Sequence, residues 1–398
     1  MTNAVPGRVE CVKHGAVNGE VARWGRSVVL VLPYGLLGAA EDYMLLLADG
    51  LGDRGWRVSV LHPRSVPVVK LRANALWEPI AVPDDAMIRP RALKKHLEAL
   101  RPDIIHVNQV VLPSIAAGAL THHSALVVTA HNPALRHHYS LKGRLLASMV
   151  KSQPDAWIVL SERNRSLLAS QRVGPRSIHV VPPGLPPARF DAPLAPDAAR
   201  KALGVPAEAF IVGTVGRLAR QKRHDILIRA LSTLVNTIPG LHLTILGDGE
   251  LRKVTEQLAS ELMPGRVTLA GHRTDVPRLL RAFDIFALSS DFEGLPFALL
   301  EAMAAGRAIV TTDVQGAGEA IRNEREGLLV PPGEPRALAA AISRLATDST
   351  LAHQLGDAAR RRFSQEYTTD LMVARTEALY GTLLASGKRR LRSRDTRL

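Results

Sequence analysis

The sequence predicts an α/β protein of two Rossmann-like, doubly wound domains that face each other across a cleft. Short apolar runs rich in Val and Ile alternate with helix-like periodic segments along nearly the whole chain, as in parallel sheets that are covered on both faces. The length of 398 residues is about twice that of a comfortable single core, which favours two domains.

Six strands are predicted in each half of the chain. The first six cover residues 27–33, 56–63, 103–107, 125–130, 156–161 and 178–184, and the second six cover 210–216, 241–247, 266–271, 284–290, 308–313 and 327–333. Proline crowds residues 182–206, where neither a strand nor a helix period is maintained, so the connection between the domains is placed there. The predicted parts are an N-terminal domain (1–185), a linker (186–206), a C-terminal domain (207–370), a C-terminal helix (371–387) and a basic tail (388–398).

Lys and Arg exceed Asp and Glu by 51 to 37, which gives a formal net charge of +14. This charge permits nucleic acid, an anionic membrane or phosphorylated ligands as partners and selects none of them. Nucleic acid is disfavoured, because aromatic residues make up only 4% of the chain and no recognised nucleic-acid module is present. The single cysteine, Cys11, and an N-terminus unlike a signal peptide favour the cytoplasm.

The stretch FEGLPFALLEAMAAG places Glu293 in a loop and Glu301 in the second turn of a predicted helix, which should end at Gly306. Pro296 suits the first helical turn, and the amides that follow it, around Phe297 and Ala298, could meet a phosphate with the positive end of the helix dipole. A carboxylate beside a phosphate site is better suited to sugar or ribose hydroxyls, because it can accept them in pairs. On spacing alone, the alternative is two solvated glutamates.

A second motif, GTVGRLARQKRHDILIRAL, places two cations just after a strand. Arg217 and Lys222 could hold a diphosphate and stabilise the charge that develops on it as it leaves. Basic residues are also common at helix starts, so a solvated face is the alternative.

In combination these motifs are specific. The segments GRLARQK, ILGDGELR, residues 271–306 and GLLVPPG, in this order and at these intervals, resemble the donor domain of the retaining GT-B glycosyltransferases of family 4. Residues 35–61, 103–107 and 159–170 are similar to the acceptor domain of the same family, less specifically.

The resemblance implies a transfer of a hexosyl-type sugar from a nucleoside diphosphate sugar to a hydroxyl acceptor, with retention. Arg217 and Lys222 would hold the donor diphosphate. Glu301 would hold the nucleotide ribose, and Glu293 would contact hydroxyls of the transferred sugar with the helix start at Pro296, Phe297 and Ala298.

Further roles are implied by the same resemblance. The turn from Gly271 to Arg273 would lie beside the base, Gly38 would approach the donor phosphate, and His131 would reach the sugar from the acceptor domain. The predicted catalytic residues are therefore His131, Arg217, Lys222 and Glu293. Taken alone, a histidine such as His131 is more often a satisfied residue at a strand end. No metal and no cofactor are expected, since Arg217, Lys222 and a helix N-terminus can do what a metal would do.

The chain departs from the family pattern in three places. Gly38 is followed by Ala39 where the family usually has a second glycine, Arg223 stands in place of a glycine, and Asn108 stands where a second histidine is frequent. These departures weaken single acceptor-side assignments and leave the donor site intact.

The expected partners are a nucleotide sugar and a glycan or lipid-linked acceptor, in polysaccharide biosynthesis. Six basic residues of the tail, against one acidic residue, are either a solvated end or a contact with an anionic membrane, on the inner face of the plasma membrane. Within the fold, a sugar-nucleotide epimerase or a phosphorylase is the alternative. A dehydrogenase is disfavoured, because no Gly-x-Gly-x-x-Gly follows the first strand.

Overall fold

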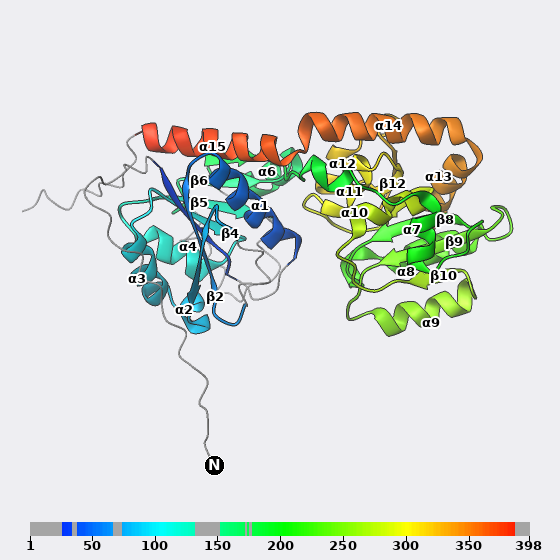
Figure 1. Ribbon diagram of the computed structural model, residues 1–398, viewed down its shortest axis with the longest axis horizontal. Coiled ribbons are helices and arrows are strands. Elements are labelled where there is room, and N and C mark those ends of the chain that lie inside the picture. The colour runs from blue at the N-terminus through cyan, green and yellow to red at the C-terminus, as the bar shows by residue number, and fades with distance from the viewer. Residues whose placement is uncertain are drawn as a thin grey trace, which may run out of the picture.

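A parallel sheet of seven strands forms the centre of the N-terminal domain in the computed structural model, which describes residues 26–33, 38–66, 74–131, 152–171, 173–174 and 177–386 (Figure 1). The strand order is β3-β2-β1-β4-β5-β6-β7, and every pairing is parallel. The strands are β1 (Ser27–Val31), β2 (Arg57–Pro63), β3 (Glu78–Val82), β4 (Ile104–Asn108), β5 (Ala125–Ala130), β6 (Ala156–Val159) and β7 (Ile178–Val180). The helices are α1 (Ala39–Asp53), α2 (Asp84–Ile88), α3 (Pro90–Leu100), α4 (Leu112–Ala119) and α6 (Glu162–Ala169).

A second parallel sheet, of six strands, forms the centre of the C-terminal domain in the order β10-β9-β8-β11-β12-β13. The strands are β8 (Phe210–Val215), β9 (Leu241–Leu246), β10 (Val267–Leu269), β11 (Ile285–Leu288), β12 (Ala308–Thr312) and β13 (Leu328–Val330). The helices are α7 (Pro196–Leu203), α8 (His224–Ser232), α9 (Arg252–Leu262), α10 (Val276–Leu279), α11 (Phe297–Ala304), α12 (Gln315–Ala320), α13 (Pro335–Thr347), α14 (Ser349–Glu366) and α15 (Thr369–Ala385), with short 3-10 turns η3 (Pro187–Phe190), η4 (Arg220–Lys222) and η5 (Leu280–Ala282).

The predicted fold of two doubly wound α/β domains is confirmed, and each of the twelve predicted strands is present. Strand β3 was not predicted, because it carries Glu78 and Pro79 and only its last residue, Val82, is buried. Proline cannot donate to a ladder from its nitrogen, so it is tolerated in β3, which lies at the edge of the sheet. None of the described helices has both the length and the apolar character needed to cross a bilayer.

The prediction of a linker without helix between residues 182 and 206 is wrong. Helix α7 begins at Pro196, whose fixed φ suits the first turn, and ends at Gly204, which takes the left-handed conformation (φ 66°). Its buried face, Ala199 and Leu203, belongs to the apolar core. The proline-rich surroundings concealed a helix that carries both of the usual terminal signals.

The chain crosses between the domains twice, and the two crossings lie side by side. Leu185 forms a parallel bridge with Thr368, and its amide donates to the carbonyl of Tyr367 over 2.9 Å. Helix α14 lies on the C-terminal domain, whereas α15, the next helix in the chain, lies on the N-terminal domain and packs against α1 (Figure 1). The predicted C-terminal helix is therefore present, and it is part of the N-terminal domain.

Helix α15 is held to the N-terminal domain by one buried and one partly buried polar contact. The Tyr380 hydroxyl lies 2.6 Å from His106 Nδ1, and the Trp56 indole N–H donates to Glu377 over 2.9 Å. One apolar cluster, which includes residues of α1, α11 and α15, continues from one domain into the other.

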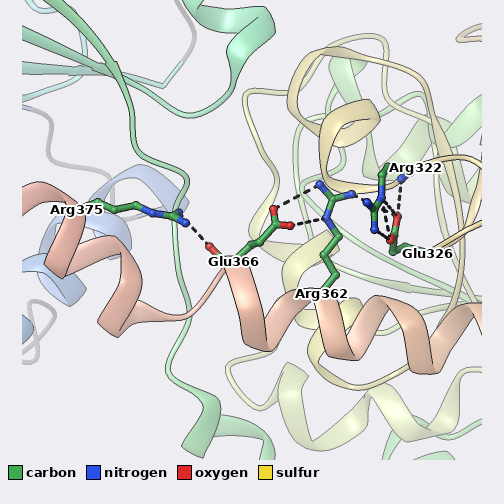
Figure 2. A network of polar contacts seen from close by, with 5 residues as sticks. All are labelled: Arg322, Glu326, Arg362, Glu366 and Arg375. Carbon is green, nitrogen blue, oxygen red and sulfur yellow. Dashed lines mark hydrogen bonds and ion pairs between the residues drawn. The ribbon is translucent and has the colours of Figure 1, made fainter.

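A row of charged side chains leads from the C-terminal domain to the junction of α14 and α15 (Figure 2). Glu326, whose side chain is only 3% exposed, accepts from Arg322 and from Arg362, and Arg362 also donates to Glu366. Arg375 of α15 donates to the Glu366 carbonyl over 3.3 Å. Burial favours the neutral acid, but hydrogen bonds from Arg322 and the charge of Arg362 outweigh it and hold the pKa of Glu326 below its ordinary value.

Replacing Arg362 by methionine should lower the free energy of unfolding by about 2 kcal/mol, because Glu326 then keeps its burial and loses a charged partner. The pKa of Glu326 is depressed in the folded protein, so the loss should be seen at neutral pH and should disappear as the pH falls through that pKa. Urea unfolding at pH 7 and at low pH measures it. Arg361→Met, at an exposed neighbouring position, is the control, and equal stability of the two variants would contradict the assignment.

Candidate active site

Loops at the carboxyl ends of β8, β9 and β10 come within backbone contact of one another. The amide of Gly247 donates to the carbonyl of Gly271 over 2.8 Å, and a Cβ built on Gly247 would lie 1.9 Å from the carbonyl oxygen of Gly216. Only glycine fits at 247, which also has φ 153°. Gly216, Gly247 and Gly271, called the glycine layer below, thus bring the main chain of three loops together at the edge where open α/β sheets bind ligands.

Arg217 and Lys222, the two predicted phosphate cations, lie in the loop and 3-10 turn that follow β8. Lys222 is largely buried and donates from Nζ to Glu293 over 2.6 Å. Arg217 is exposed, and no described side chain pairs with it. The two cations are therefore not equivalent: part of the charge of Lys222 is already balanced by a carboxylate, whereas Arg217 is paired with no carboxylate of the described residues.

Arg223 takes a left-handed backbone conformation, with φ 48° and ψ 45°. A residue with a Cβ is strained in this conformation, which glycine takes at little cost. The guanidinium donates to Asp225 and Asp291 at 3.0 to 3.2 Å, which raises its pKa and holds the strained turn. The departure from the family pattern is thus compensated locally.

Glu293 is buried, and its carboxylate is held by several donors. Besides Lys222, the Ser290 hydroxyl donates to Oε1 over 2.8 Å and the Gln221 amide donates to Oε2 over 3.4 Å. The backbone amide of Glu293 donates in turn to the side chain of Gln315 over 3.3 Å. The two contacts at Oε1 are shorter than the one at Oε2, so Oε2 keeps the greater capacity to accept hydrogen bonds from a ligand.

Helix α11 begins directly behind this loop, as predicted, with Pro296 at the N-cap and Phe297 as its first residue. No side chain caps its first amides. The helix ends at Ala304, and Gly306 follows in the left-handed conformation (φ 63°). The predicted helix and its stop are confirmed, and its N-terminal amides lie next to Glu293.

Glu301, in the second turn of α11, faces the N-terminal domain. Burial raises its pKa to about 7; the positive charge of Arg189 opposes this shift, and the negative charge of Asp42, on α1, adds to it. No described group donates a hydrogen bond to its carboxylate. A desolvated carboxylate of this kind is stabilised by a ligand that supplies hydroxyl donors.

The two domains meet at Gly294 and His131. A Cβ built on Gly294 would lie 2.2 Å from the carbonyl oxygen of His131, so the loop after β5 and the loop before α11 are in backbone contact. Asn164 of α6 donates to the Gly294 carbonyl over 3.4 Å, and Arg163 pairs with Asp313 over 2.6 Å. These contacts place His131 beside the loop that holds Glu293.

His131 is also a satisfied strand-end histidine, since its Nε2 lies 2.8 Å from the Asn108 side-chain oxygen. Burial lowers its pKa to about 4, so the ring is neutral at pH 7. His131 can therefore be a hydrogen-bonded histidine at a strand end and still lie where it could reach a sugar, so the two interpretations that the sequence leaves open are compatible.

Two residues predicted to bind the sugar donor already form hydrogen bonds within the protein. The amide of Gly38 donates to the Glu41 carboxylate over 3.0 Å, and its φ of −151° needs no glycine. The Arg273 guanidinium is held by Asp275 over 2.7 and 2.8 Å. Gly271 and Arg273 can still offer backbone groups beside the glycine layer, as the prediction requires, whereas Gly38 would have to release Glu41 first.

Sequence reasoning missed the side chains that hold Glu293 in place, namely Gln221, Ser290 and Gln315. They lie in three separate segments, and only the folded chain brings them together. Ser290 stands three residues before Glu293 at a strand end, which is the one signal the sequence offered. Within the described ranges, no three His, Cys, Asp or Glu side chains gather so that they could hold a metal ion.

Family models match most of the chain. Residues 40–189 match the model described as Glycosyltransferase Family 4, and residues 196–362 match Glycosyl transferases group 1. The two matches divide the chain close to the connection between the domains.

Known proteins are similar over different lengths. Lipopolysaccharide core biosynthesis glycosyltransferase LpsE of Rhizobium meliloti is 35% identical over 176 residues, 43% of this chain and 51% of that protein, so the match spans about half of that relative. Glycogen synthase of Mycobacterium tuberculosis is 30% identical over 308 residues, 74% of this chain and 73% of that protein. Among solved structures, Anabaena Alr3699/HepE in complex with UDP and glucose is similar with a TM-score of 0.78 and 22% identity, over 89% of this chain and 99% of that one.

Proposed function

Because the chain belongs to the glycosyltransferase family 4 of GT-B fold, we propose that it transfers a hexosyl-type sugar from a nucleoside diphosphate sugar to a hydroxyl group of a glycan, a lipid-linked molecule or a small molecule. The observation that supports this most directly is the ion pair of Lys222 and Glu293, 2.6 Å apart, between a glycine layer and the uncapped start of α11. A cation, helix amides and a carboxylate at one place suit a molecule that joins a diphosphate to a polyol. Retention of the anomeric configuration is proposed from family membership.

The donor would lie with its diphosphate at Arg217, Lys222 and the amides of α11. The sugar would face Glu293 and His131, and the ribose would face Glu301. When the bond between the anomeric carbon and the diphosphate breaks, negative charge grows on the departing phosphate, and the fixed cations and helix amides stabilise it. No metal is assigned a part in this step, and turnover in excess EDTA tests that proposal.

If the acceptor is lipid-linked, the enzyme should work at a membrane surface. A lipid-linked acceptor would bring the enzyme to the inner face of a membrane, and the basic tail (388–398), which lies outside the described residues, would add roughly 1 kcal/mol of attraction per basic residue near an anionic surface. Liposome sedimentation at low and high salt, with and without the tail, tests this proposal.

A thermal-shift screen with UDP-glucose, UDP-galactose, GDP-mannose and the free nucleotides tests the donor class. A ligand at 100 times its dissociation constant adds about 2.7 kcal/mol of stability. Release of nucleotide only when an acceptor is added would separate transfer from the alternative of an epimerase, and NMR of the product would report the anomer. No stabilisation by any nucleotide or nucleotide sugar would contradict the proposal.

Replacing Glu301 by glutamine should weaken the binding of free nucleoside diphosphate roughly 10- to 100-fold, because the ribose loses a charged acceptor. The same variant should be more stable than the wild type at pH 8 without ligand. In the folded protein the pKa of Glu301 is raised to about 7, so its contribution to stability is fully present at low pH and is lost as the pH rises through 7.

Calorimetry and thermal unfolding at pH 5 and pH 8 measure the two effects. Glu208→Gln, at an exposed position, is the control for both. Unchanged nucleotide affinity in a folded Glu301→Gln protein would rule out the ribose assignment.

A further inference from the structure

Asn108 is a fully buried side chain at the end of β4, directly beside the end of β5. Its amide group makes two contacts with different parts of the N-terminal domain. The nitrogen Nδ2 donates to the carbonyl of Ala40, in the first turn of α1, over 3.1 Å. The oxygen Oδ1 lies 2.8 Å from Nε2 of His131.

These two contacts fix which atom of Asn108 faces which neighbour. The Ala40 carbonyl can only accept, so the NH2 group of the amide must point at it. The oxygen then points at His131, and an amide oxygen can only accept. Nε2 of His131 must therefore carry the hydrogen, and in a neutral ring Nδ1 is left as an acceptor.

The ring plane of His131 is held as well. The buried ring of Tyr43, on α1, meets the His131 ring edge to face at 5.2 Å and 89°. No described group forms a hydrogen bond to Nδ1. The histidine thus has one nitrogen bound to the protein, while its backbone carbonyl touches Gly294, the neighbour of Glu293.

We propose that Asn108 is a positioning residue, which holds His131 as its Nε2–H tautomer and leaves Nδ1 to accept a hydrogen bond from a hydroxyl group of the bound sugar. The choice of a sugar hydroxyl rests on the proposed function, whereas the tautomer rests on the contacts of Asn108 alone. Asparagine suits this role, because it supplies one donor and one acceptor and remains uncharged at every pH used by the enzyme.

The surroundings keep the His131 ring neutral. Among the described residues, the titratable groups near it are His106 on β4 and Tyr43 on α1, and Glu293 precedes the glycine that meets the His131 carbonyl. Burial lowers the pKa of His131 to about 4, and burial together with the charge of His131 lowers that of His106 to about 3. An isosteric change of Asn108 to aspartate would replace the neutral oxygen by a charged one and would stabilise the imidazolium.

The test is NMR of the ligand-free protein with ¹⁵N-labelled histidine, in which the signals of His131 are assigned with a His131→Gln variant. The wild type should show a single tautomer with the hydrogen on Nε2 between pH 6 and 8. Asn108→Asp should raise the proton affinity of His131 at least tenfold. Gln109→Gly, which removes the neighbouring amide that contacts Glu41, should leave His131 unchanged.

Kinetics give a second readout, with whichever of UDP-glucose, UDP-galactose or GDP-mannose stabilises the protein most. The acid-side fall of kcat/KM should move to higher pH in Asn108→Asp, because protonation of Nδ1 removes the acceptor; a merely structural role would lower activity without moving the profile.

The outcomes separate the two claims. Hydrogen on Nδ1, a mixture of tautomers in the wild type, or an unchanged His131 pKa in Asn108→Asp would overturn the positioning role even in an active transferase. Failure of every nucleotide sugar to bind would overturn the proposed function and leave the tautomer result standing. The wild-type measurement needs no variant, so it decides the assignment even if Asn108→Asp does not fold.

Discussion

Replacing Arg217 by methionine should lower the turnover of sugar transfer by roughly two to three orders of magnitude while leaving the free energy of unfolding unchanged. The side chain is exposed and is paired with no described carboxylate, so its charge is available to the leaving diphosphate and contributes little to folding. Lys222→Met should differ, because it leaves the buried Glu293 carboxylate without its cation and should lower stability as well as turnover.

Single-turnover kinetics and urea unfolding measure the two quantities for each variant. Arg220→Met, an exposed arginine of the same turn, is the matched control and should keep wild-type turnover. If Arg217→Met retained more than a tenth of the wild-type turnover, the diphosphate assignment would have to be given up. Combining Lys222→Met with Glu293→Gln should recover stability and not activity, since it removes the unpaired charge.

Replacing Gly294 by alanine should lower turnover by about 100-fold or more, because the added Cβ would lie 2.2 Å from the His131 carbonyl oxygen and the two domains must move apart to accept it. Misplacement of catalytic groups by about 1 Å is sufficient for a loss of this size. The affinity for free nucleoside diphosphate should change much less, since the nucleotide assignment lies within the C-terminal domain.

Small-angle scattering of the variant, beside steady-state kinetics, would report the separation. Gly381→Ala, in α15, is the control: apart from its own helix backbone and chain neighbours, no heavy atom of the described residues lies within 4 Å of the place that the added methyl group would take, so this change should be neutral or slightly stabilising. Wild-type turnover in Gly294→Ala would mean that the domains do not need this contact during the reaction.

Local patterns in the sequence were sufficient for the strands of both sheets and for the helix that begins behind Glu293. The buried strands were recognisable as apolar runs. The ends of α11 were predicted correctly because the proline before it and the glycine after it lie next to its own residues. Strand β3 was not predicted, because an edge strand buries too few side chains to need an apolar run. Helix α7 was not predicted, because other prolines lie near the proline and glycine that mark its ends.

Contacts between distant segments were beyond local reasoning. Both partners of the Lys222–Glu293 pair were chosen from the sequence, yet for separate ligand groups, and their pairing follows only from the adjacency of β8 and β11. The side of the molecule on which α15 lies depends on Trp56, His106 and Tyr380, which are far apart in the chain. In the sequence, Asn108 was only a residue that replaced a frequent histidine. Its role beside His131 follows from its two contacts in the folded chain.

The pairing of Leu185 with Thr368 has a consequence for how the chain is made. Helix α15 covers the N-terminal domain, so that domain remains incomplete on the ribosome until the C-terminal domain and then α15 have been synthesised. The C-terminal domain, whose sheet and helices end before the second crossing, has all its parts earlier. Domains generally fold as units from the N-terminal side during synthesis. Here that order is interleaved: synthesis of the N-terminal domain starts before that of the C-terminal domain and is completed after it, and the surface of α1 that α15 covers stays open during the interval.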